Sequence, residues 1–405
     1  MLKLYKHQQE LIDLDPKRWL MAHGTGTGKT VTAIKLCEGK GTTLVVVPKS
    51  IKEQWYESLG KFLVDSVDIL NWSVITKEEF RRDYRTLGGY DNLIIDEGHH
   101  FLGHKSAMYK HAMAYLRKHK PVRVYLLTAT PYRSSPFNIM CAGNLLGMNK
   151  KSWYDWKVMF YYDVRMGARS IPMIRTKVNG KPITEVIAEM VRRMGNAVSI
   201  QDCADVPEQT HITEYFDLTA EQKKAIRELD DIVHIARWTH THQICGGTKK
   251  GDKYNEDEYY KSEKLGRLLE LAKENDKLFV VCRYNNELKF LKEKLAGYNV
   301  EILNGETKNR HEIIKKAEAS DKFILLVQAK ISEGYECPSF PIMIFYSMDF
   351  GLVEYTQIIG RILRLNKLKK NVYIYFVVKD TIDADVKKCI DTKKSFDIAI
   401  YNNDK

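Results

Sequence analysis

Short continuous apolar runs alternate with amphipathic stretches along the first half of the chain. The runs are Trp19–Ala22, Leu44–Val47, Leu93–Ile95 and Val124–Leu127, and amphipathic stretches such as Val31–Glu38 lie between them. Runs that are apolar on both faces are typical of parallel strands covered by helices on each side. The alternation therefore predicts an α/β fold with a doubly wound parallel sheet in this half.

The same rhythm returns in the second half and predicts a second unit of the same kind in tandem. A stretch of different composition separates the halves. From about residue 134 to 195 few segments have the pattern of a strand, and most are helical and rich in basic and aromatic residues. We therefore expect lobes at residues 1–200 and 201–405, with a helical basic insertion at the end of the first. The apolar runs of the second half are Phe279–Cys282, Phe323–Val327, Ile342–Tyr346 and Val372–Val378.

Two local patterns refine this division. Thr219-Ala-Glu-Gln222 has the spacing of a capping box, and it predicts one long helix through about Trp238. In the insertion, Trp153, Trp156 and Phe160 recur at helical spacing among basic residues. Such rings can stack on nucleic-acid bases, but the spacing favours packing inside a protruding helical subdomain.

Composition limits the class of protein. The 405 residues are 44% hydrophobic and 11% aromatic, which excludes a wholly disordered chain, and the length suits two or three domains. No apolar run approaches the roughly 18 residues of a membrane span, and the N-terminus lacks the apolar core of a signal peptide. Seven scattered cysteines without a CxxC pair indicate reduced thiols in the cytoplasm, not a disulfide framework or a zinc module.

The charge balance points to a partner. The chain has 64 Lys and Arg against 52 Asp and Glu, a net charge of +12, which favours polyanions such as nucleic acid. Residues 149–193 hold ten basic residues against four acids and so contribute +6, half of the total. This stretch is either a solvated face or a phosphate-binding surface. In the second interpretation its candidate contacts are Lys150, Lys151, Arg192 and Arg193.

A glycine-rich loop stands between the first apolar run and the first amphipathic stretch. Glycines there let backbone N–H groups surround phosphates at a helix N-terminus, and a lysine adds positive charge. A threonine hydroxyl directly after the lysine reaches a Mg²⁺ ion. The pattern predicts a nucleotide site whose residues are Gly24, Thr25, Gly26, Thr27, Gly28, Lys29 and Thr30.

Two acids end the third apolar run. Asp96 and Glu97 follow it directly, at the end of a predicted strand. A strand end beside a phosphate loop needs one carboxylate to hold the metal and another to orient the attacking water, because phosphoryl transfer depends on positioning and electrostatics. We assign the metal to Asp96 together with Thr30, and the water to Glu97.

Hydroxyls and arginines complete the candidate chemistry. Thr128 and Thr130 end the next apolar run and fit a segment that couples the nucleotide to a second ligand. Arg361 and Arg364 stand three residues apart and share one face of a helix if that segment is helical. An arginine from a second lobe can neutralise charge on the transferring phosphate, so we assign both to catalysis.

In this order the motifs resemble those of superfamily 2 helicases and translocases of the DExH kind, over nearly the whole chain. The resemblance implies two RecA-like lobes with ATP in the cleft between them. It assigns adenine recognition to Gln8, nucleic-acid contact to Pro48, Lys49 and Ser50, and coupling of hydrolysis to motion to His99, Thr128, Thr130, Gly334 and Gln357.

The first lobe is more specifically similar to the double-stranded DNA translocases of the Swi/Snf type. Pro48-Lys-Ser, Gln54-Trp55 and Asp96-Glu-Gly-His carry this similarity. Two positions depart from the subgroup, which usually has an acid where His23 stands and a glycine where Ala129 stands. The second lobe resembles instead the DNA repair and phage-type helicases.

The resemblance implies a motor that requires ATP and Mg²⁺ and translocates along, unwinds or remodels DNA, with duplex DNA favoured over single-stranded or forked DNA. We also expect a monomeric cytoplasmic enzyme without a membrane partner, and the small size suits a phage or mobile-element protein or one half of a larger machine. Two rival hypotheses stay open: an RNA helicase on the same scaffold, and a clamp or loader that closes around DNA with ATP but does not move. Intact Lys29, Asp96, Glu97, Arg361 and Arg364 argue against the clamp.

Overall fold

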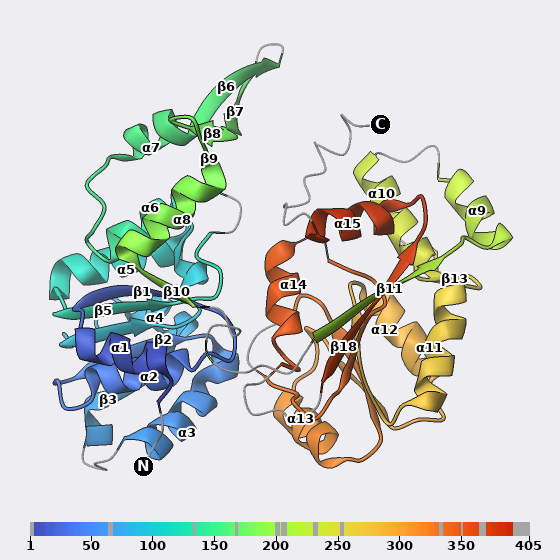
Figure 1. Ribbon diagram of the computed structural model, residues 1–405, viewed down its shortest axis with the longest axis horizontal. Helices are drawn as coiled ribbons and strands as arrows, with labels where there is room; N and C mark the ends of the chain where they lie inside the picture. The colour runs from blue at the N-terminus through green and yellow to red at the C-terminus, as the bar shows by residue number, and fades with distance from the viewer. Residues whose placement is uncertain are drawn as a thin grey trace. The chain divides into compact units, whose positions relative to one another are not determined.

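The computed structural model describes residues 4–63, 68–132, 135–166, 169–198, 203, 209–229, 234–251, 255–331, 335–349, 351–363 and 370–391. The chain forms two compact units, Met1–Asp205 and Val206–Lys405, and each has its own sheet and hydrophobic core (Figure 1). In the described part of the chain, no helix is long and apolar enough to cross a membrane.

Unit 1 is built, over its described residues, on one sheet of six parallel strands, which are β1 (Arg18–His23), β2 (Thr43–Val47), β3 (Trp72–Thr76), β4 (Asn92–Ile95), β5 (Arg123–Leu127) and β10 (Gly195–Val198). They lie in the order β10-β1-β5-β4-β2-β3. Parallel neighbours need crossover connections, and helices supply them. β5 therefore lies between β1 and β4, and the carboxyl ends of all three strands meet at one edge of the sheet.

Helices cover both faces of this sheet. One face packs against α1 (Lys6–Leu14), α2 (Lys29–Cys37) and α3 (Lys52–Phe62), and the other against α4 (Lys77–Asp83), α5 (Ala107–His119), α6 (Phe137–Leu145) and α8 (Ile183–Met194). Successive strand residues point to opposite faces, so Val45 and Val47 join the first cluster, and Leu44 and Val46 the second. Burial on both faces explains the continuous apolar runs. The short 3₁₀ helices of the unit are η1 (Lys49–Ile51), η2 (Asp68–Asn71) and η3 (Gly98–Phe101).

The insertion of unit 1 contains α6, α8 and the helix α7 (Trp153–Phe160), as predicted, and also antiparallel strands that the sequence analysis did not anticipate. These strands are β6 (Tyr161–Met166) paired with β7 (Arg169–Ile174), and β8 (Lys177–Val178) paired with β9 (Lys181–Pro182). The longer hairpin extends away from the sheet (Figure 1). Trp156 and Phe160 are buried in the core of the unit, which confirms packing as their role, whereas Trp153 is 47% exposed and stacks on Phe137, with ring centroids 5.7 Å apart.

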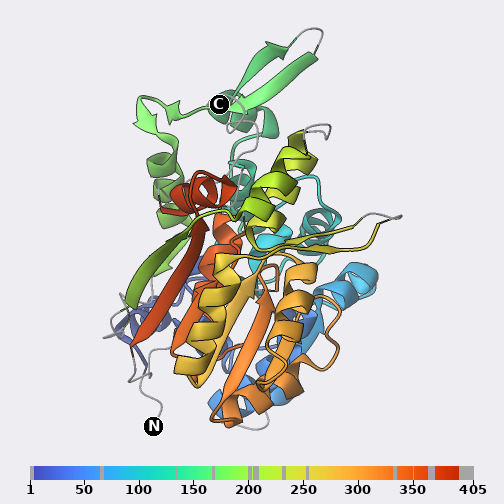
Figure 2. The ribbon, with the colours of Figure 1, turned by 90° about the vertical axis from the view of Figure 1, so that its right-hand side faces the viewer.

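Unit 2 has, over its described residues, a second sheet of six parallel strands, which are β11 (Gln209–Phe216), β14 (Lys277–Cys282), β15 (Val300–Leu303), β16 (Phe323–Gln328), β17 (Ile342–Phe345) and β18 (Asn371–Val378). Their order is β11-β18-β17-β14-β16-β15, and Figure 2 shows β11 beside β18 at one edge. One face packs against α11 (Glu263–Glu274) and α12 (Asn285–Lys294). The other packs against α13 (Arg310–Ala319), α14 (Leu352–Ile359) and α15 (Ile382–Asp391).

The start of unit 2 differs from the prediction of one long helix. The capping box is present, because Thr219 Oγ1 accepts a hydrogen bond from the Gln222 backbone N–H. The helix that it starts, α9 (Ala220–Arg227), ends well before Trp238, which lies in a separate helix, α10 (His234–Cys245). A short hairpin, β12 (Thr248–Lys249) with β13 (Glu258–Tyr259), follows. The predicted fold class, two tandem RecA-like doubly wound lobes, is nevertheless confirmed by the two parallel sheets.

Candidate nucleotide-binding site

The glycine-rich loop of unit 1 connects β1 to α2. Gly26 and Gly28 have φ angles of +78° and +79°, a left-handed conformation that other side chains rarely adopt, so the loop needs glycine there. Gly28 is the N-cap of α2, and the first N–H groups of the helix therefore point into the loop. Gly24 and Thr25 are half-buried within it. A helix N-terminus in this geometry binds anions such as phosphate.

The lysine of the loop is held inside it. Lys29 Nζ donates to the carbonyl oxygens of His23 at 2.8 Å and Gly24 at 3.0 Å. Thr27 Oγ1 donates to the same Gly24 carbonyl at 2.8 Å, and Thr30 lies half-buried in the first turn of α2. The ammonium group is therefore fixed beside the N–H groups that would contact a phosphate.

Helix α1 places its first turn against the loop. Gln8 is buried; its Nε2 donates to the Gly28 carbonyl at 3.1 Å and its Oε1 accepts from the Tyr5 N–H at 2.8 Å. A Cβ added to Gly28 would come within 2.3 Å of Gln8 Nε2, so the end of the Gln8 side chain would have to move. Gln8 thus braces the phosphate loop, and its recognition of adenine stays a prediction.

His23, at the position where the Swi/Snf pattern has an acid, is fully buried at the end of β1. Its Nε2 lies 2.8 Å from Asn196 Oδ1 on β10, and Trp19 Nε1 donates to the same oxygen at 2.9 Å. Burial, aided by repulsion from Lys29 and His7, lowers the pKa of His23 to about 4 although the Asn196 hydrogen bond opposes this. The imidazole is therefore neutral near pH 7.

The acid pair follows β4 at the same edge of the sheet. Asp96 is only 7% exposed; its Oδ1 accepts from the Glu97 N–H and its Oδ2 from Trp55 Nε1, both at 2.8 Å. Burial and repulsion by Glu97 raise the pKa of Asp96 to about 6, although Trp55 and the nearby Lys29 act in the opposite direction. The parallel strands thus bring the phosphate loop and the two carboxylates close together.

Glu97 has an unusual backbone conformation. Its φ angle is +47°, in the left-handed region that costs free energy for any residue other than glycine. Its Oε2 lies 3.2 Å from Nδ1 of His99, whose side chain is completely buried. Strain of this kind is often found at functional sites, and here it accompanies a carboxylate that lies beside a buried histidine.

The segment after β5 lies between the loop and the acid pair in the sheet. The Thr128 N–H donates to the Met21 carbonyl of β1 at 3.1 Å, and Thr128 Oγ1 accepts from the Thr130 N–H at 3.1 Å. Thr130 Oγ1 is buried and has no hydrogen-bond partner among the described residues. A buried hydroxyl without a partner is costly, so Thr130 suits a bound ligand or water at this edge.

The oxygen atoms of this site fit a hard cation. Lys29 lies near enough to Asp96 to favour its charged form, but burial and repulsion by Glu97 outweigh this and raise the pKa of Asp96. Within the described ranges, no group of three or more His, Cys, Asp or Glu side chains could hold a metal ion. Mg²⁺ binds oxygen and usually completes its shell with water and substrate phosphates. Asp96 and Thr30 therefore suit a Mg²⁺ ion that also contacts a nucleotide.

Unit 2 carries the other predicted catalytic and coupling residues. Gln357, on α14, and Arg361 are both buried. Arg361 Nη1 donates to the Tyr335 carbonyl at 2.9 Å, and the guanidinium lies 5.4 Å from the centre of the Tyr335 ring. Arg361 Nε is buried and has no hydrogen-bond partner among the described residues. Gly334 and Arg364 lie outside the described residues.

The loop after β2 carries the predicted nucleic-acid segment. Pro48 is buried, whereas Lys49 and Ser50 are exposed in η1. β2 is parallel to β4, so this loop lies at the same edge of the sheet as Asp96. The position is consistent with a nucleic-acid contact near the nucleotide site, which stays a prediction.

The four basic candidates of the insertion are all exposed. Lys150, Lys151 and Arg193 line one hollow of about 260 Å³ beside α8, and Arg193 Nη2 lies 4.0 Å from Glu189 Oε2. Arg192 does not line this hollow. The structure thus brings three of the four candidates together on one surface.

Sequence reasoning missed two contacts of the site. The bond between Trp55 and Asp96 joins residues 41 positions apart, and the bond between His23 and Asn196 joins residues 173 apart. In the sequence, Trp55 was identified only as part of the Swi/Snf pattern, and Asn196 lies close to the expected boundary between the lobes, so neither was predicted to contact the site. The four-residue strand that carries Asn196 has no apolar run to mark it, so no local signal could have revealed its role.

Two protein families and several relatives are similar to parts of this chain. The family described as "Type III restriction enzyme, res subunit" matches residues 2–87, and the family described as "Helicase conserved C-terminal domain" matches residues 260–366. The Xenopus tropicalis "SWI/SNF-related matrix-associated actin-dependent regulator of chromatin subfamily A-like protein 1" is 31% identical over 137 residues, which cover 29% of this chain and 14% of the relative.

Two further proteins are similar. The Xenopus laevis protein of the same name is 28% identical over 141 residues, again covering 29% of this chain and 14% of the relative. A structure described as "Sulfolobus solfataricus SWI2/SNF2 ATPase core in complex with dsDNA" is 18% identical, with a TM-score of 0.42, and covers 96% of this chain and 91% of that chain. At that TM-score the likeness carries no weight beside the two sheets themselves.

Proposed function

We propose that this chain, a superfamily 2 helicase of the Swi/Snf type, hydrolyses ATP to move along, unwind or remodel DNA. The motifs predicted the family, and the two family matches and the Swi/Snf relatives agree with it. The observation that carries the activity is the edge of unit 1 where Lys29 lies near the buried Asp96, which Glu97 follows directly. Because the relatives are matched over only 14% of their length, the activity and substrates are proposals.

The phosphate loop is the proposed site of the ATP phosphates. Residues 24–30 present backbone N–H groups, and Lys29 adds a positive charge that the loop already orients through two carbonyl oxygens. Gln8, which braces the loop, is proposed to contact the adenine. Mg²⁺, held by Asp96 and Thr30, would neutralise negative charge on the phosphates when bound.

Glu97 is proposed to orient the attacking water. Its backbone strain and the adjacent His99 fix the carboxylate, so the water can be aligned without loss of side-chain freedom during the reaction. Repulsion from the neighbouring Asp96 helps keep the two carboxyl groups in distinct roles. Arg361 and Arg364 of unit 2 are proposed to supply positive charge to the transferring phosphate.

The segment Thr128–Thr130 is proposed to couple the nucleotide to nucleic acid. It bonds to β1, which carries the phosphate loop, and it follows β5, which lies beside the strand of the acid pair. A change at the phosphates can therefore reach this segment through short, buried hydrogen bonds. Gly334 and Gln357 are proposed to act with it, and His99 to link Glu97 to the same movement.

Duplex DNA is the proposed substrate. The first-lobe pattern is that of duplex translocases, and the net charge of +12 favours a polyanion. The proposed backbone contacts are Pro48, Lys49 and Ser50 together with Lys150, Lys151, Arg192 and Arg193 of the insertion. That the enzyme is monomeric, cytoplasmic and encoded by a phage stays a prediction.

Steady-state ATP hydrolysis tests the proposal. The rate is measured without nucleic acid and with blunt duplex DNA, single-stranded DNA, forked DNA or RNA, and Lys29→Ala serves as the control for the site. We expect strong stimulation by blunt duplex and no hydrolysis above background in Lys29→Ala. Movement is then tested by displacement of a third strand from a triplex.

The same measurement separates the rival functions. Stimulation mainly by RNA would support the RNA helicase and leave the nucleotide site unchanged. ATP-dependent DNA binding without any hydrolysis in the parent protein would support the clamp. Hydrolysis that no nucleic acid stimulates would contradict all three hypotheses.

A further inference from the structure

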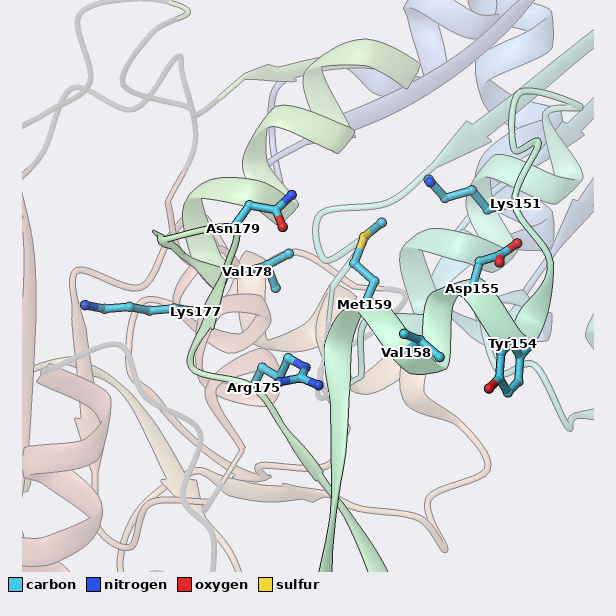
Figure 3. A pocket seen from close by; sticks show the side chains of 9 residues that line it. All are labelled: Lys151, Tyr154, Asp155, Val158, Met159, Arg175, Lys177, Val178 and Asn179. Carbon is cyan, nitrogen blue, oxygen red and sulfur yellow. The ribbon is translucent and has the colours of Figure 1, made fainter.

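The insertion of unit 1 has an open hollow that the nucleotide site does not use. Its volume is about 520 Å³, within the range of sites that bind small molecules or single nucleotides. Figure 3 shows one wall formed by α7 and by Lys151, two residues before it, and the opposite wall formed by residues 175–179, which contain β8. The lining residues are Lys151, Tyr154, Asp155, Val158, Met159, Arg175, Lys177, Val178 and Asn179.

The wall opposite α7 is built rigidly. β8 and β9 are joined by the two-residue turn Asn179-Gly180, with φ angles of +50° and +80°, which is the tight hairpin turn that this residue pair favours. Val178 is buried in the core of unit 1 and anchors the strand. The Arg175 N–H donates to the Phe160 carbonyl at 2.8 Å, so the arginine is attached directly to the end of α7.

The hollow is positively charged. Lys151, Arg175 and Lys177 line it, and none of them forms an ion pair with a described residue. Its one acid, Asp155, caps α7, because its Oδ2 accepts from the Ser152 N–H at 2.8 Å and from Ser152 Oγ at 2.7 Å, and it also attracts the nearby Lys151. Arg175 and Lys177 therefore remain available for an anionic ligand.

The hollow also presents an aromatic ring to solvent. Tyr154 is 67% exposed and has no ring or hydrogen-bond partner among the described residues, and Val158, one turn along α7, is 54% exposed. The Arg175 guanidinium lies 5.9 Å from the ring of Tyr162. Exposed aromatic and apolar surface beside cations is the combination that grips a nucleic-acid strand, since bases stack on rings and phosphates meet the charges.

We propose that this hollow binds a single strand of DNA, with a base against Tyr154 and Val158 and the backbone phosphates against Arg175 and Lys177. A duplex does not suit it, because paired bases are stacked and cannot reach a ring beside the backbone. The site rests on the proposed DNA motor function and adds to it a grip on an unpaired strand. An acidic peptide is the alternative ligand that the charges permit.

Binding of an oligothymidylate that carries one 2-aminopurine tests the site in the full-length protein. We compare the parent with Arg175→Ala/Lys177→Ala and with Tyr154→Ala and Tyr154→Phe. A matched control is Lys61→Ala/Lys110→Ala, which removes two exposed cations from α3 and α5. All these side chains are exposed, so the fold should be retained, and circular dichroism checks it.

We expect the double variant and Tyr154→Ala each to weaken single-strand binding by about tenfold or more, whereas the Lys61/Lys110 control changes it less than about threefold. Quenching of 2-aminopurine fluorescence should be lost in Tyr154→Ala and restored in Tyr154→Phe. Affinity for blunt duplex should change little in the Tyr154 variants.

Three results would overturn the site: unchanged single-strand affinity, equal losses for single strand and duplex, or competition by an acidic peptide as effective as that by DNA. The motor function is contradicted by a different result, namely that DNA does not stimulate ATP hydrolysis by the parent protein. If the parent hydrolyses ATP with duplex DNA but the variants bind single strands as tightly as the parent does, the motor function is supported and the single-strand site is contradicted.

Discussion

At the scale of single residues, Glu97 combines strained backbone, a buried acidic neighbour and a histidine partner. Glutamine has nearly the same shape but cannot accept a proton or attract the attacking water as strongly. We expect Glu97→Gln to lower ATP hydrolysis by about 10²- to 10⁴-fold and to leave ATP affinity within about twofold. Steady-state hydrolysis and titration with a fluorescent ATP analogue measure the two effects.

The matched control for Glu97 is Glu53→Gln, which changes an exposed acid on α3 of the same unit. It should leave hydrolysis unchanged. Normal turnover in Glu97→Gln would contradict the role of this carboxylate in orienting water, although the site could still bind nucleotide.

His23 gives a prediction about pH. Its pKa is about 4 in the folded protein, below the ordinary value of 6.5 that the unfolded chain restores. The unfolded state therefore binds more protons between these values, and the contribution of His23 to stability is lost as the pH falls from 6.5 toward 4. At pH 5 this loss is about 2 kcal/mol for a group that remains buried.

Thermal unfolding at pH 7.5 and pH 5 tests the role of His23. The decrease in Tm between the two conditions should be smaller in His23→Gln than in the parent by roughly 5 °C, because glutamine does not titrate. Equal decreases in both proteins would show that the imidazole does not stay buried and neutral. The comparison between the two pH values cancels any constant effect of the substitution.

At the scale of elements, β10 lies close against β1 at Gly195. A Cβ at Gly195 would lie 1.8 Å from the Leu20 carbonyl oxygen on β1, and backbone cannot move aside as a flexible side chain can. We expect Gly195→Ala to lower the free energy of unfolding by more than about 3 kcal/mol, and to disturb the bond between Asn196 and His23. Urea denaturation followed by tryptophan fluorescence measures this change.

Gly60→Ala is the corresponding control in α3, because nothing lies within 4 Å of the added Cβ. In the interior of a helix, alanine should stabilise by about 0.5–1 kcal/mol relative to glycine. A Gly195→Ala protein as stable as Gly60→Ala would show that β10 does not pair with β1 as described.

Strands could be predicted where both of their faces are buried, because burial then requires an unbroken run of apolar residues. Val45 and Val47 face one cluster and Leu44 and Val46 the other, so the run had to be apolar throughout. The hairpins of the insertion lack this constraint because their strands are largely exposed. In β7, Pro172 also removes a backbone donor, which argues against a strand although the hairpin places it opposite Asp163.

At the scale of the whole molecule, the sequence predicted which chemical groups each unit carries but not how they are held. The phosphate loop and acid pair are readable because each follows a strand directly. The environment of Arg361 is not: its contact with Tyr335 depends on packing within unit 2, which no motif encodes. The same holds for the bracing of the loop by Gln8, since helix α1 meets the loop only in the folded unit.

The uneven charge of the molecule gives the last prediction. Half of the net charge of +12 lies in residues 149–193, so duplex binding should be strongly salt-dependent. Each phosphate contact adds about 0.9 to the slope of log affinity against log salt concentration. If the four basic candidates contact phosphates, replacing them with alanine should flatten this slope by up to about 3 to 4 units. These residues are Lys150, Lys151, Arg192 and Arg193.

Fluorescence anisotropy with a blunt duplex, between about 50 and 200 mM KCl, measures the slope. A control protein loses the same amount of charge from the exposed side chains of Lys61, Lys110, Arg117 and Lys273, which lie on α3, α5 and α11. Only the insertion variant should show the flatter slope of log affinity against log salt concentration. This slope depends on how many phosphates the protein contacts, because each contact releases counterions, and not on the net charge of the protein. Equal flattening in both proteins would mean that general attraction, and not a surface on the insertion, holds the duplex.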